Sequence, residues 1–573
     1  MRVVSVLLLC LVCCNVAAQV DEMEYIMRFV GASSPEDVDM DEAERLAEFL
    51  GSPLKVNKVS VGVLESSGLF SRFQVAALED YRSRHGDIMS WLELASVDGF
   101  SKSFVDLLRP FVSLSGGEIG GGSGGGFMDG EVAVRSAMKR SSGDVSGRIG
   151  DLQWNYGAKS KLDVGEHMHY AIGFNRPYAA SGGLPEDYSV SVQYDFRRAR
   201  GKLLVGDFNA RFGQGLVIWN GAFMSGLDSP DTFMKKPSGL SRCWSYNGSS
   251  ANTGVASEFW FGNVSLSSFV AVVGLKDAAE EPDRLHIFPA VNLLWRMKYG
   301  HLSTTHSVKY GLAGAETAFE SSVDAAFCIR GVNLFGEAAY SWMEGQYKLL
   351  AGTDFCAGGD SRMAVQMRHS AKESTGLSWA ASFGTGYSRH RGTVSLDAVC
   401  YDSPKGDEEH VSHQLRVKAS WEYQILEILK LKLRADERYR TWGQPFRTSI
   451  RTDLSCEHGC FSGNFRGDVL WCRDFAAACY LEGGYRTDRV SAYLRQGFFR
   501  VDYWDDRIYV YERDIPGSFT VPALYGRGLW TSAMLSYKPS RDLKFAVRCS
   551  YTAYYKKVKP GKAELKLYAV LKF

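Results

Sequence analysis

Apolar and polar residues alternate one by one along most of this chain, from residue 127 to the carboxyl terminus. In YSVSVQYDF (188–196) and LRVKASWEYQ (415–424), every second residue is apolar and the residues between them are polar or charged. Because successive side chains of a β-strand point to opposite faces, each stretch predicts a strand with one apolar and one polar face. Gly, Asn, Asp and Lys separate the stretches, and Gly262-Asn263 is predicted to form a hairpin turn.

These strands predict a large antiparallel transmembrane β-barrel of about 24 strands, within a range of roughly 20 to 26. A soluble β-sandwich shows the same alternation, but this zone of nearly 450 residues has no division into sandwich-sized units. Aromatic residues gather at strand ends, as at Trp154 and Trp342, which suits the interfaces of a membrane. The last stretch, AELKLYAVLKF, ends in Phe573. A terminal aromatic residue of this kind resembles the membrane-insertion signal of Gram-negative outer-membrane barrels.

The chain begins with MRVVSVLLLCLVCCNVAAQ, in which Arg2 precedes an apolar run and then small residues. This pattern predicts a secretory signal peptide, residues 1–18, with cleavage before Gln19. A membrane anchor and a lipid attached at Cys13 or Cys14 are the alternatives. The apolar run is short for an anchor, and the residues before the two cysteines fit a lipoprotein signal poorly. Export is consistent with a location in the cell outer membrane.

The segment between the signal peptide and the barrel has a helical pattern. Residues 19–54 predict an acidic helical lead-in, residues 55–114 a small all-α domain, and residues 115–126 (SGGEIGGGSGGG) a flexible linker to the barrel at 127–573. No later segment contains the roughly 18 consecutive apolar residues of a membrane-spanning helix.

Residues 56–114 resemble the tandem helix-hairpin-helix domain of competence-type DNA receptors. The resemblance rests on Asn57, the Tyr81-Arg82 pair, Gly86 at a helix end, and the second hairpin Gly99-Phe100-Ser101. The whole chain also resembles a group of Gram-negative outer-membrane proteins that carry this module ahead of a large barrel. GDFNARFGQGLVIWNG (206–221) and DDRIYVYERDIPGSF (505–519) look like signatures of that group. The resemblance implies a periplasmic helical module attached to an outer-membrane barrel.

In the DNA-binding family, hairpin glycines let backbone N–H groups approach a phosphate closely. The resemblance makes seven residues candidates for phosphate contact: Gly99, Phe100, Ser101, Lys102, Ser71, Arg82 and Arg84. The first hairpin departs from the pattern, because Leu69-Phe70-Ser71 stands where the glycines are expected. Leu69 and Phe70 are expected either to obstruct a phosphate or to bury against the neighbouring helix.

Charge is divided unevenly along the chain. Residues 19–54 contain ten acidic and two basic residues, and residues 55–114 contain seven of each, which gives this module a net charge of −8. The whole chain is +1 and Arg2 leaves with the signal peptide, so the rest is near +8. DNA binding draws on Lys and Arg, so this charge disfavours DNA as a partner. It favours a module that docks at the mouth of the basic barrel or contacts protein partners.

The sequence shows no catalytic constellation, and it implies no cofactor and no metal ion. No spacing of Ser, His and Asp marks a triad, and no HExxH motif is present. Nine cysteines follow the signal peptide with irregular spacing. Cys456 and Cys460 flank a predicted turn and are candidates for a disulfide or, with His458, a metal site; small residues on strand faces are the simpler interpretation.

Asp207, Arg211 and Gln214 lie between glycines in GDFNARFGQG (206–215). They are candidates for an inward-facing constriction of the lumen. A kinked or bulged strand pair is the alternative, because Gly213 and Gly215 suit a kink.

The sequence thus predicts an integral outer-membrane β-barrel, acting as a channel or an assembly scaffold, whose periplasmic module contacts partners or plugs the barrel. The expected partners are outer-membrane lipid and periplasmic or outer-membrane proteins. DNA binding or uptake through the helix-hairpin-helix module is the first alternative function, and a barrel enzyme is the second.

Overall fold

The computed structural model describes residues 22–573, apart from the following positions: 33, 39, 60, 115–127, 143–151, 166, 179, 181, 197–199, 221–226, 247–250, 275–284, 313–315, 359–360, 371–373, 385–388, 406–407 and 556–559. The predicted signal peptide and the Gly-rich linker lie outside the described residues.

Residues 22–114 form a helical module around one hydrophobic core. Its elements are α2 (Glu22–Val30), η1 (Pro35–Asp37), α3 (Met40–Gly51), β1 (Leu54–Lys55), α4 (Val61–Ser67), α5 (Arg72–His85), α6 (Trp91–Leu94), α7 (Lys102–Leu108) and β2 (Val112–Ser113). The acidic lead-in belongs to the same core as the rest, since Ile26 and Leu46 are buried together with Leu64 and Phe111. None of the described helices is long and apolar enough to cross a membrane.

The remainder of the described chain is β-structure. Its strands are β3 (Met128–Ser142), β4 (Gln153–Val164), β5 (Met168–Arg176), β6 (Asp187–Phe196), β7 (Gly201–Arg211), β8 (Gly239–Arg242), β9 (Asn252–Phe261), β10 (Val264–Val273), β11 (His286–Met297), β12 (Gly300–Gly311), β13 (Ala318–Ile329), β14 (Val332–Ser341), β15 (Gln346–Gly358), β16 (Ser361–Ser370), β17 (Ser374–Phe383), β18 (His390–Lys405), β19 (Glu408–Leu426), β20 (Leu429–Arg440), β21 (Phe446–His458), β22 (Phe461–Trp471), β23 (Phe475–Arg486), β24 (Val490–Val501), β25 (Ile508–Tyr509), β26 (Ala523–Leu524), β27 (Gly526–Tyr537), β28 (Leu543–Tyr554) and β29 (Gly561–Lys572). Two 3-10 turns, η2 (Pro230–Thr232) and η4 (Trp504–Asp506), lie in the loops.

Twenty-four of the described strands close into an antiparallel barrel, which confirms the predicted fold class and strand number. β29 pairs with β3 and closes the ring. The short strand β8 is additional, because it pairs with β7 beside β9. Gly262-Asn263 forms the predicted two-residue turn, since Phe261 pairs with Val264 across it.

The barrel wall carries apolar side chains on its outside and polar side chains on its inside. On β6, Tyr188 and Val190 are 53% and 48% exposed, whereas Ser189 and Ser191 are almost fully buried. This is the reverse of a soluble protein and is the arrangement that a lipid-facing barrel requires. The inward side chains are buried because the lumen is filled.

Two long loops and the helical module fill the lumen. At one end of the barrel, the short-turn end, the strands are joined by tight connections such as 262–263 and 427–428, and the chain terminates there. At the opposite, long-loop end, a first lumen loop (212–251) follows β7 and a second lumen loop (502–525) follows β24.

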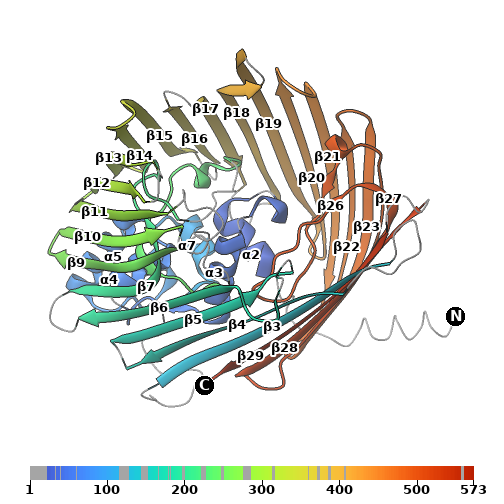
Figure 1. Cartoon of the computed structure of the whole chain (residues 1–573), viewed down its shortest axis with the longest axis horizontal. Helices are drawn as coiled ribbons and strands as arrows, with labels where there is room; N and C mark the ends of the chain where they lie inside the picture. Colours follow the sequence, from blue (N-terminus) through green and yellow to red (C-terminus); the bar gives the residue numbers. More distant parts are fainter. Residues whose placement is uncertain are drawn as a thin grey trace.

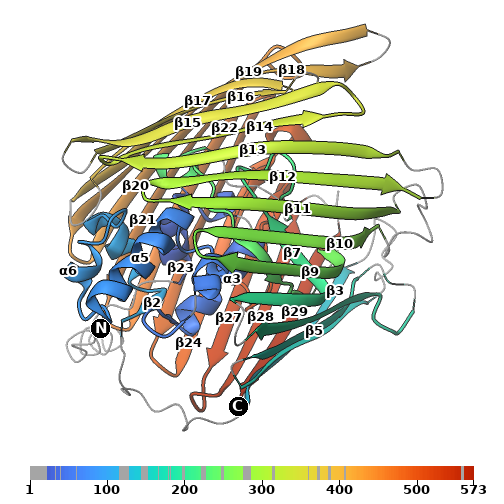
Figure 2. The same ribbon diagram turned by 90° about the vertical axis from the view of Figure 1, so that its left-hand side faces the viewer.

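The helical module occupies the short-turn end. Its helices lie within the ring of strands when the barrel is viewed along its axis (Figure 1), and they gather toward one end in the perpendicular view (Figure 2). Contacts agree with this placement: Glu65 of α4 accepts a hydrogen bond from Trp260, next to the 262–263 turn, and Glu24 of α2 pairs with Lys430, next to the 427–428 turn.

Candidate functional site

Among the residues that the structure describes, ten ion pairs join the helical module to the barrel, and the module supplies the acid in each of these ten. The pairs are Glu24–Lys430, Glu36–Arg451, Glu36–Arg466, Asp37–Arg434, Asp37–Lys418, Glu44–Lys159, Glu48–Lys161, Glu65–Arg296, Glu79–Arg296 and Glu79–Arg200. The bases come from strands all round the barrel, so the module is held from several sides at once. We call these residues the docking surface.

Glu36 makes the most complete set of contacts in the docking surface. Arg451 Nη1 lies 2.8 Å from its Oε2, and Arg466 Nη1 lies 2.8 Å from its Oε1. The backbone N–H of Tyr511, in the second lumen loop, also donates to Oε1 at 2.7 Å. The barrel and its loop therefore form a cradle for one carboxylate, and Pro35 begins the 3-10 turn that presents Glu36 to it.

The pKa values of carboxyl groups in the docking surface are shifted in opposite directions. Burial raises the pKa of Glu24, but Lys430 and Arg28 outweigh burial and hold it at about 2. Burial is likewise outweighed at Glu36, where Arg451 and Arg466 hold the pKa well below its usual range.

Glu48 behaves in the opposite way. Burial is its largest influence and raises its pKa to about 7. The nearby Glu44 and Glu131 also raise it, and Lys161, which is 3.8 Å away, lowers it without outweighing burial. Neutralising Glu48 therefore stabilises the docked module, whereas neutralising Glu24 or Glu36 destabilises it.

Ion pairs also join the two lumen loops to the barrel wall. Asp228 and Asp231 of the first lumen loop pair with Lys418 and Arg362. In the second lumen loop, Glu512 pairs with Arg548 and Asp514 with Lys566. Pairs of the opposite sense also occur, since Arg513 of the second lumen loop pairs with Glu482 of β23. This mutual pairing explains why so many charged groups stay buried inside the barrel.

The first lumen loop also touches the module. The Lys236 ammonium lies 4.9 Å from the ring centres of both Phe29 and Phe104. Burial lowers the pKa of Lys236 to about 8. The module and the two loops therefore form one continuous filling of the lumen.

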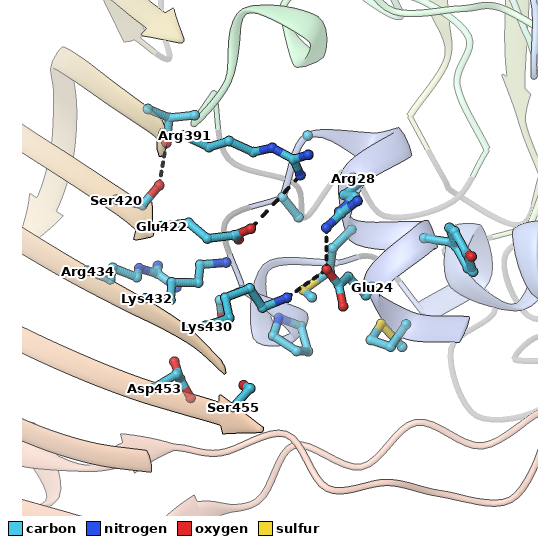
Figure 3. Close-up of a pocket in the computed structure, with 18 of the residues that line it drawn as sticks. Glu24, Arg28, Arg391, Ser420, Glu422, Lys430, Lys432, Arg434, Asp453 and Ser455 are labelled. Carbon is cyan, nitrogen blue, oxygen red and sulfur yellow. Dashed lines mark hydrogen bonds and ion pairs between the residues drawn. The ribbon is translucent and has the colours of Figure 1, made fainter. Parts of the chain in front are cut away.

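A cavity of about 520 Å³ remains between α2, α7, the first lumen loop and the inner faces of β16–β24. Eleven basic and seven acidic residues line it. Figure 3 shows Arg391, Lys430, Lys432 and Arg434 extending from the strands toward α2. Among the described residues, Lys432 makes no ion pair. The cavity is therefore positively charged and has a cation available for a solute.

The residues expected to contact phosphate are divided between the two hairpins. Leu69 and Phe70 of the first hairpin are at most 1% exposed, and Arg45 of α3 covers Gly68. Phe100 of the second hairpin packs on Phe70, with ring centres 6.0 Å apart. The apolar turn residues therefore bury in the module core.

The two serines and the two arginines of this set have partners within the module. The Ser71 and Ser101 hydroxyls accept the backbone N–H of the third residue of α5 and α7, at 3.2 Å, and so cap these helices. Arg82 donates to the Asn57 carbonyl at 2.7 Å, and Arg84 pairs with Asp80. Gly99, Ser101, Lys102 and Arg84 are exposed, whereas Arg82 is half-buried.

Asn57 and Tyr81, which carried the family resemblance, connect the parts of the module. The buried Asn57 amide donates to the carbonyls of Ile88 and Leu114 and accepts from the Ile88 N–H. The Tyr81 hydroxyl donates to Glu93 at 3.0 Å. These contacts give the motif a structural role.

Asp207, Arg211 and Gln214 lie where the first lumen loop leaves β7. Asp207 is buried and accepts the Val190 N–H and the Thr253 hydroxyl, which holds β6, β7 and β9 together. Arg211 donates to the Asn220 carbonyl, and the Gln214 side chain accepts the Lys235 N–H. All three bind neighbouring backbone or strands. Phe573 is exposed and pairs through its backbone with Gly130 of β3.

The sequence analysis did not identify the inward-facing basic residues of β19–β22 as part of a site. Its signal is visible in LKLKLRADERYR (429–440), where the alternate residues Lys430, Lys432 and Arg434 are all basic. Alternation predicts that such residues share a face, but it does not reveal which acids they meet.

The described residues contain no group of three His, Cys, Asp or Glu side chains placed to hold a metal ion. Cys456, on β21, is exposed, and Cys460, in the β21–β22 turn, is buried.

No protein-family model matches the sequence, and no curated protein matches it. Solved structures with some similarity include the translocation pore of the P pilus usher PapC (TM-score 0.34, 10% identity, 78% of this chain and 99% of that chain). Others are the siderophore receptor PirA from Pseudomonas aeruginosa (0.40, 8%, 78% and 80%) and the FrpB iron transporter from Neisseria meningitidis, F3-3 variant (0.40, 8%, 78% and 81%). At these scores the likeness carries no conclusion about what this protein binds or transports.

Proposed function

We propose that this protein is a channel in the outer membrane of a Gram-negative bacterium and that its helical module closes the channel from the periplasmic side. The predicted signal peptide, the apolar outer surface and the terminal Phe573 support the membrane location. In such barrels the short turns face the periplasm, and the module lies at the short-turn end.

The observation that carries this proposal is the one-sided docking surface. The ten ion pairs of the described residues have their acids on the module and their bases on the barrel, and they attract the module to the mouth without specifying a tight apolar fit. A permanent domain interface is usually more apolar, whereas a charged one suits a plug that leaves and returns.

The module stands ahead of the barrel in the chain and is expected to be joined to it by the Gly-rich segment 115–126. A flexible tether keeps the displaced module at high effective concentration near the mouth. Closure is therefore expected to be rapid and reversible.

The first experiment compares ion conductance of the full chain and of a chain lacking residues 19–126 in planar bilayers. The truncated barrel should conduct at least several times more, because the module no longer fills the short-turn end. Equal conductance in folded samples of both would refute closure by the module.

The second experiment keeps the chain intact. Glu36→Lys with Asp37→Lys places like charges against Arg451 and Arg434, and it should raise the time spent open. Asp87→Lys with Asp98→Lys makes the same change in charge at exposed sites of the module and should leave the conductance unchanged. If both pairs open the channel equally, net charge rather than the docking surface is responsible.

A further inference from the structure

Apart from the Ser34 hydroxyl, which donates to Glu36 Oε2, the groups that hold the Glu36 carboxylate lie outside the module. Arg451 comes from β21, Arg466 from β22, and the Tyr511 N–H from the second lumen loop. Arg466 also donates to Asp453, and Arg451 to Asp468, so both guanidinium groups are oriented by the wall itself. Charge-assisted hydrogen bonds from oriented guanidinium groups are a strong way for a protein to hold a carboxylate.

The module presents further carboxylates to the same wall. Asp37 lies 2.8 Å from Arg434, and Glu24 lies 2.8 Å from Lys430. Three carboxylates of one short segment thus meet neighbouring bases on β20–β22. The arrangement is that of a polycarboxylate bound to a basic surface.

The cavity beside this segment leaves room for a solute. Its volume of about 520 Å³ falls within the range of roughly 300–1,000 Å³ that is usual for small-molecule sites. Lys432 projects into it without an ion pair among the described residues, and Figure 3 shows this side chain beside Lys430, opposite Glu24 and Arg28. A second anionic group can therefore be bound next to the site that Glu36 fills.

We propose that the barrel lumen binds small organic polycarboxylates at Arg451, Arg466 and Lys432, and that Glu36 is a built-in competitor occupying this site while the channel is closed. The solute and the module exclude each other because one pair of guanidinium groups serves both. The role of the site in a transport path rests on the proposed channel function, whereas the binding itself does not.

Competition predicts a gain in affinity when the competitor is removed. The apparent affinity of a solute falls in proportion to the fraction of molecules whose site is vacant. Glu36→Ala vacates the cradle, so citrate should bind the full chain about tenfold more tightly than it binds the wild type. Glu36→Gln keeps the cradle filled by an amide and should show a smaller gain.

Isothermal titration calorimetry of the full chain in detergent measures this with citrate as the probe. Asp87→Ala, which removes an exposed acid of the module, is the matched control and should bind citrate as the wild type does. Adding Arg451→Gln and Arg466→Gln to Glu36→Ala should abolish the gain. Inorganic phosphate is titrated in parallel.

Equal citrate affinity in the wild type and Glu36→Ala overturns the proposal, and so does a gain for phosphate without one for citrate. If Glu36→Ala fails to fold, hydrogen exchange of the wild-type chain with and without citrate tests the proposal. Citrate must then increase exchange in α2 and α3, and an unchanged pattern overturns the proposal.

These outcomes separate the inference from the proposed function. A gain in citrate affinity together with unchanged conductance after deletion of 19–126 would leave a binding site without a channel. A rise in conductance without any gain in citrate affinity would leave a channel whose module is not a competitor for carboxylates.

Discussion

Glu24, Glu36 and Glu48 lie in the same docking surface, yet their carboxyl groups respond oppositely to pH. The docked pKa of Glu24 is about 2 and that of Glu36 is well below its ordinary value of 4.5. Their contribution to docking is full above pH 4.5 and is lost as the pH falls through the docked values. The docked pKa of Glu48 is about 7, so its contribution is full below pH 4.5 and is lost as the pH rises through 7.

The closed state should therefore be most stable near pH 4.5 and less stable on either side. Open probability in planar bilayers, measured from about pH 3 to about pH 8, checks this. The change in open probability should be smaller on the alkaline side than on the acid side. The reason is that the Glu48 side chain is 35% exposed, so solvent screens its interactions. Glu48→Gln should flatten the alkaline limb alone, and Glu24→Gln should weaken the acid limb alone. A profile that neither variant changes would contradict these assignments.

Asn57→Ala tests the residue that joins the two ends of the module. The substitution leaves the Ile88 N–H and the Ile88 and Leu114 carbonyls without their side-chain partner. Loss of such buried hydrogen bonds should lower the stability of the module by about 3 kcal/mol. Faster hydrogen exchange in α4–α7 reports it, with the exposed Ser83→Ala as the control. Exchange as slow as in the wild type would show that Asn57 is dispensable.

Alanine substitutions at Gly99 and Gly86 distinguish the cost of backbone strain from the cost of a steric clash. Both have a positive φ, +83° and +84°, where side chains are unfavourable. A Cβ on Gly99 would lie 2.7 Å from the Phe73 ring, whereas a Cβ on Gly86 would meet nothing within 4 Å.

Gly99→Ala should destabilise the module by more than Gly86→Ala, because Gly86, at φ +84° and ψ −154°, carries only the backbone cost of about 1–3 kcal/mol. Thermal unfolding or hydrogen exchange of the module compares the two variants. An equal loss of stability in the two variants would mean that Phe73 moves aside at little cost and that the clash with Gly99→Ala is relieved. The prediction belongs to the element, because it depends on how α5 packs against the turn before α7.

For the individual elements, the sequence predicted the strands and their faces but not the positions of the two lumen loops. Alternation fixes the faces of β6 because each residue of a strand turns its side chain by half a turn. The two stretches that resembled signatures, 206–221 and 505–519, were visible in the sequence only as conserved-looking motifs of a group. Their place within the lumen depends on long-range pairs such as Asp514–Lys566, which no local pattern contains.

Over the whole molecule, docking through opposite charges should respond to salt. The Debye length falls from about 10 Å at 0.1 M to about 3 Å at 1 M, which weakens the attraction between the module and the mouth. Conductance of the full chain, divided by the conductivity of the buffer, should therefore rise with salt. The chain lacking 19–126 should show no such rise. An equal response of both would place the salt effect in the barrel.

The sequence by itself determined the barrel, the approximate number of its strands and the outward direction of its apolar faces, because these follow from local alternation and the length of the chain. It also determined the opposite charges of module and barrel, since charge is additive over residues. Only the tertiary structure decided that Glu36 meets Arg451 and Arg466, that the first hairpin is buried, and that the loops enter the lumen. Each of these depends on contacts between residues far apart in the chain. Closure of the barrel determines which residues meet, because it brings distant strands to face one enclosed space.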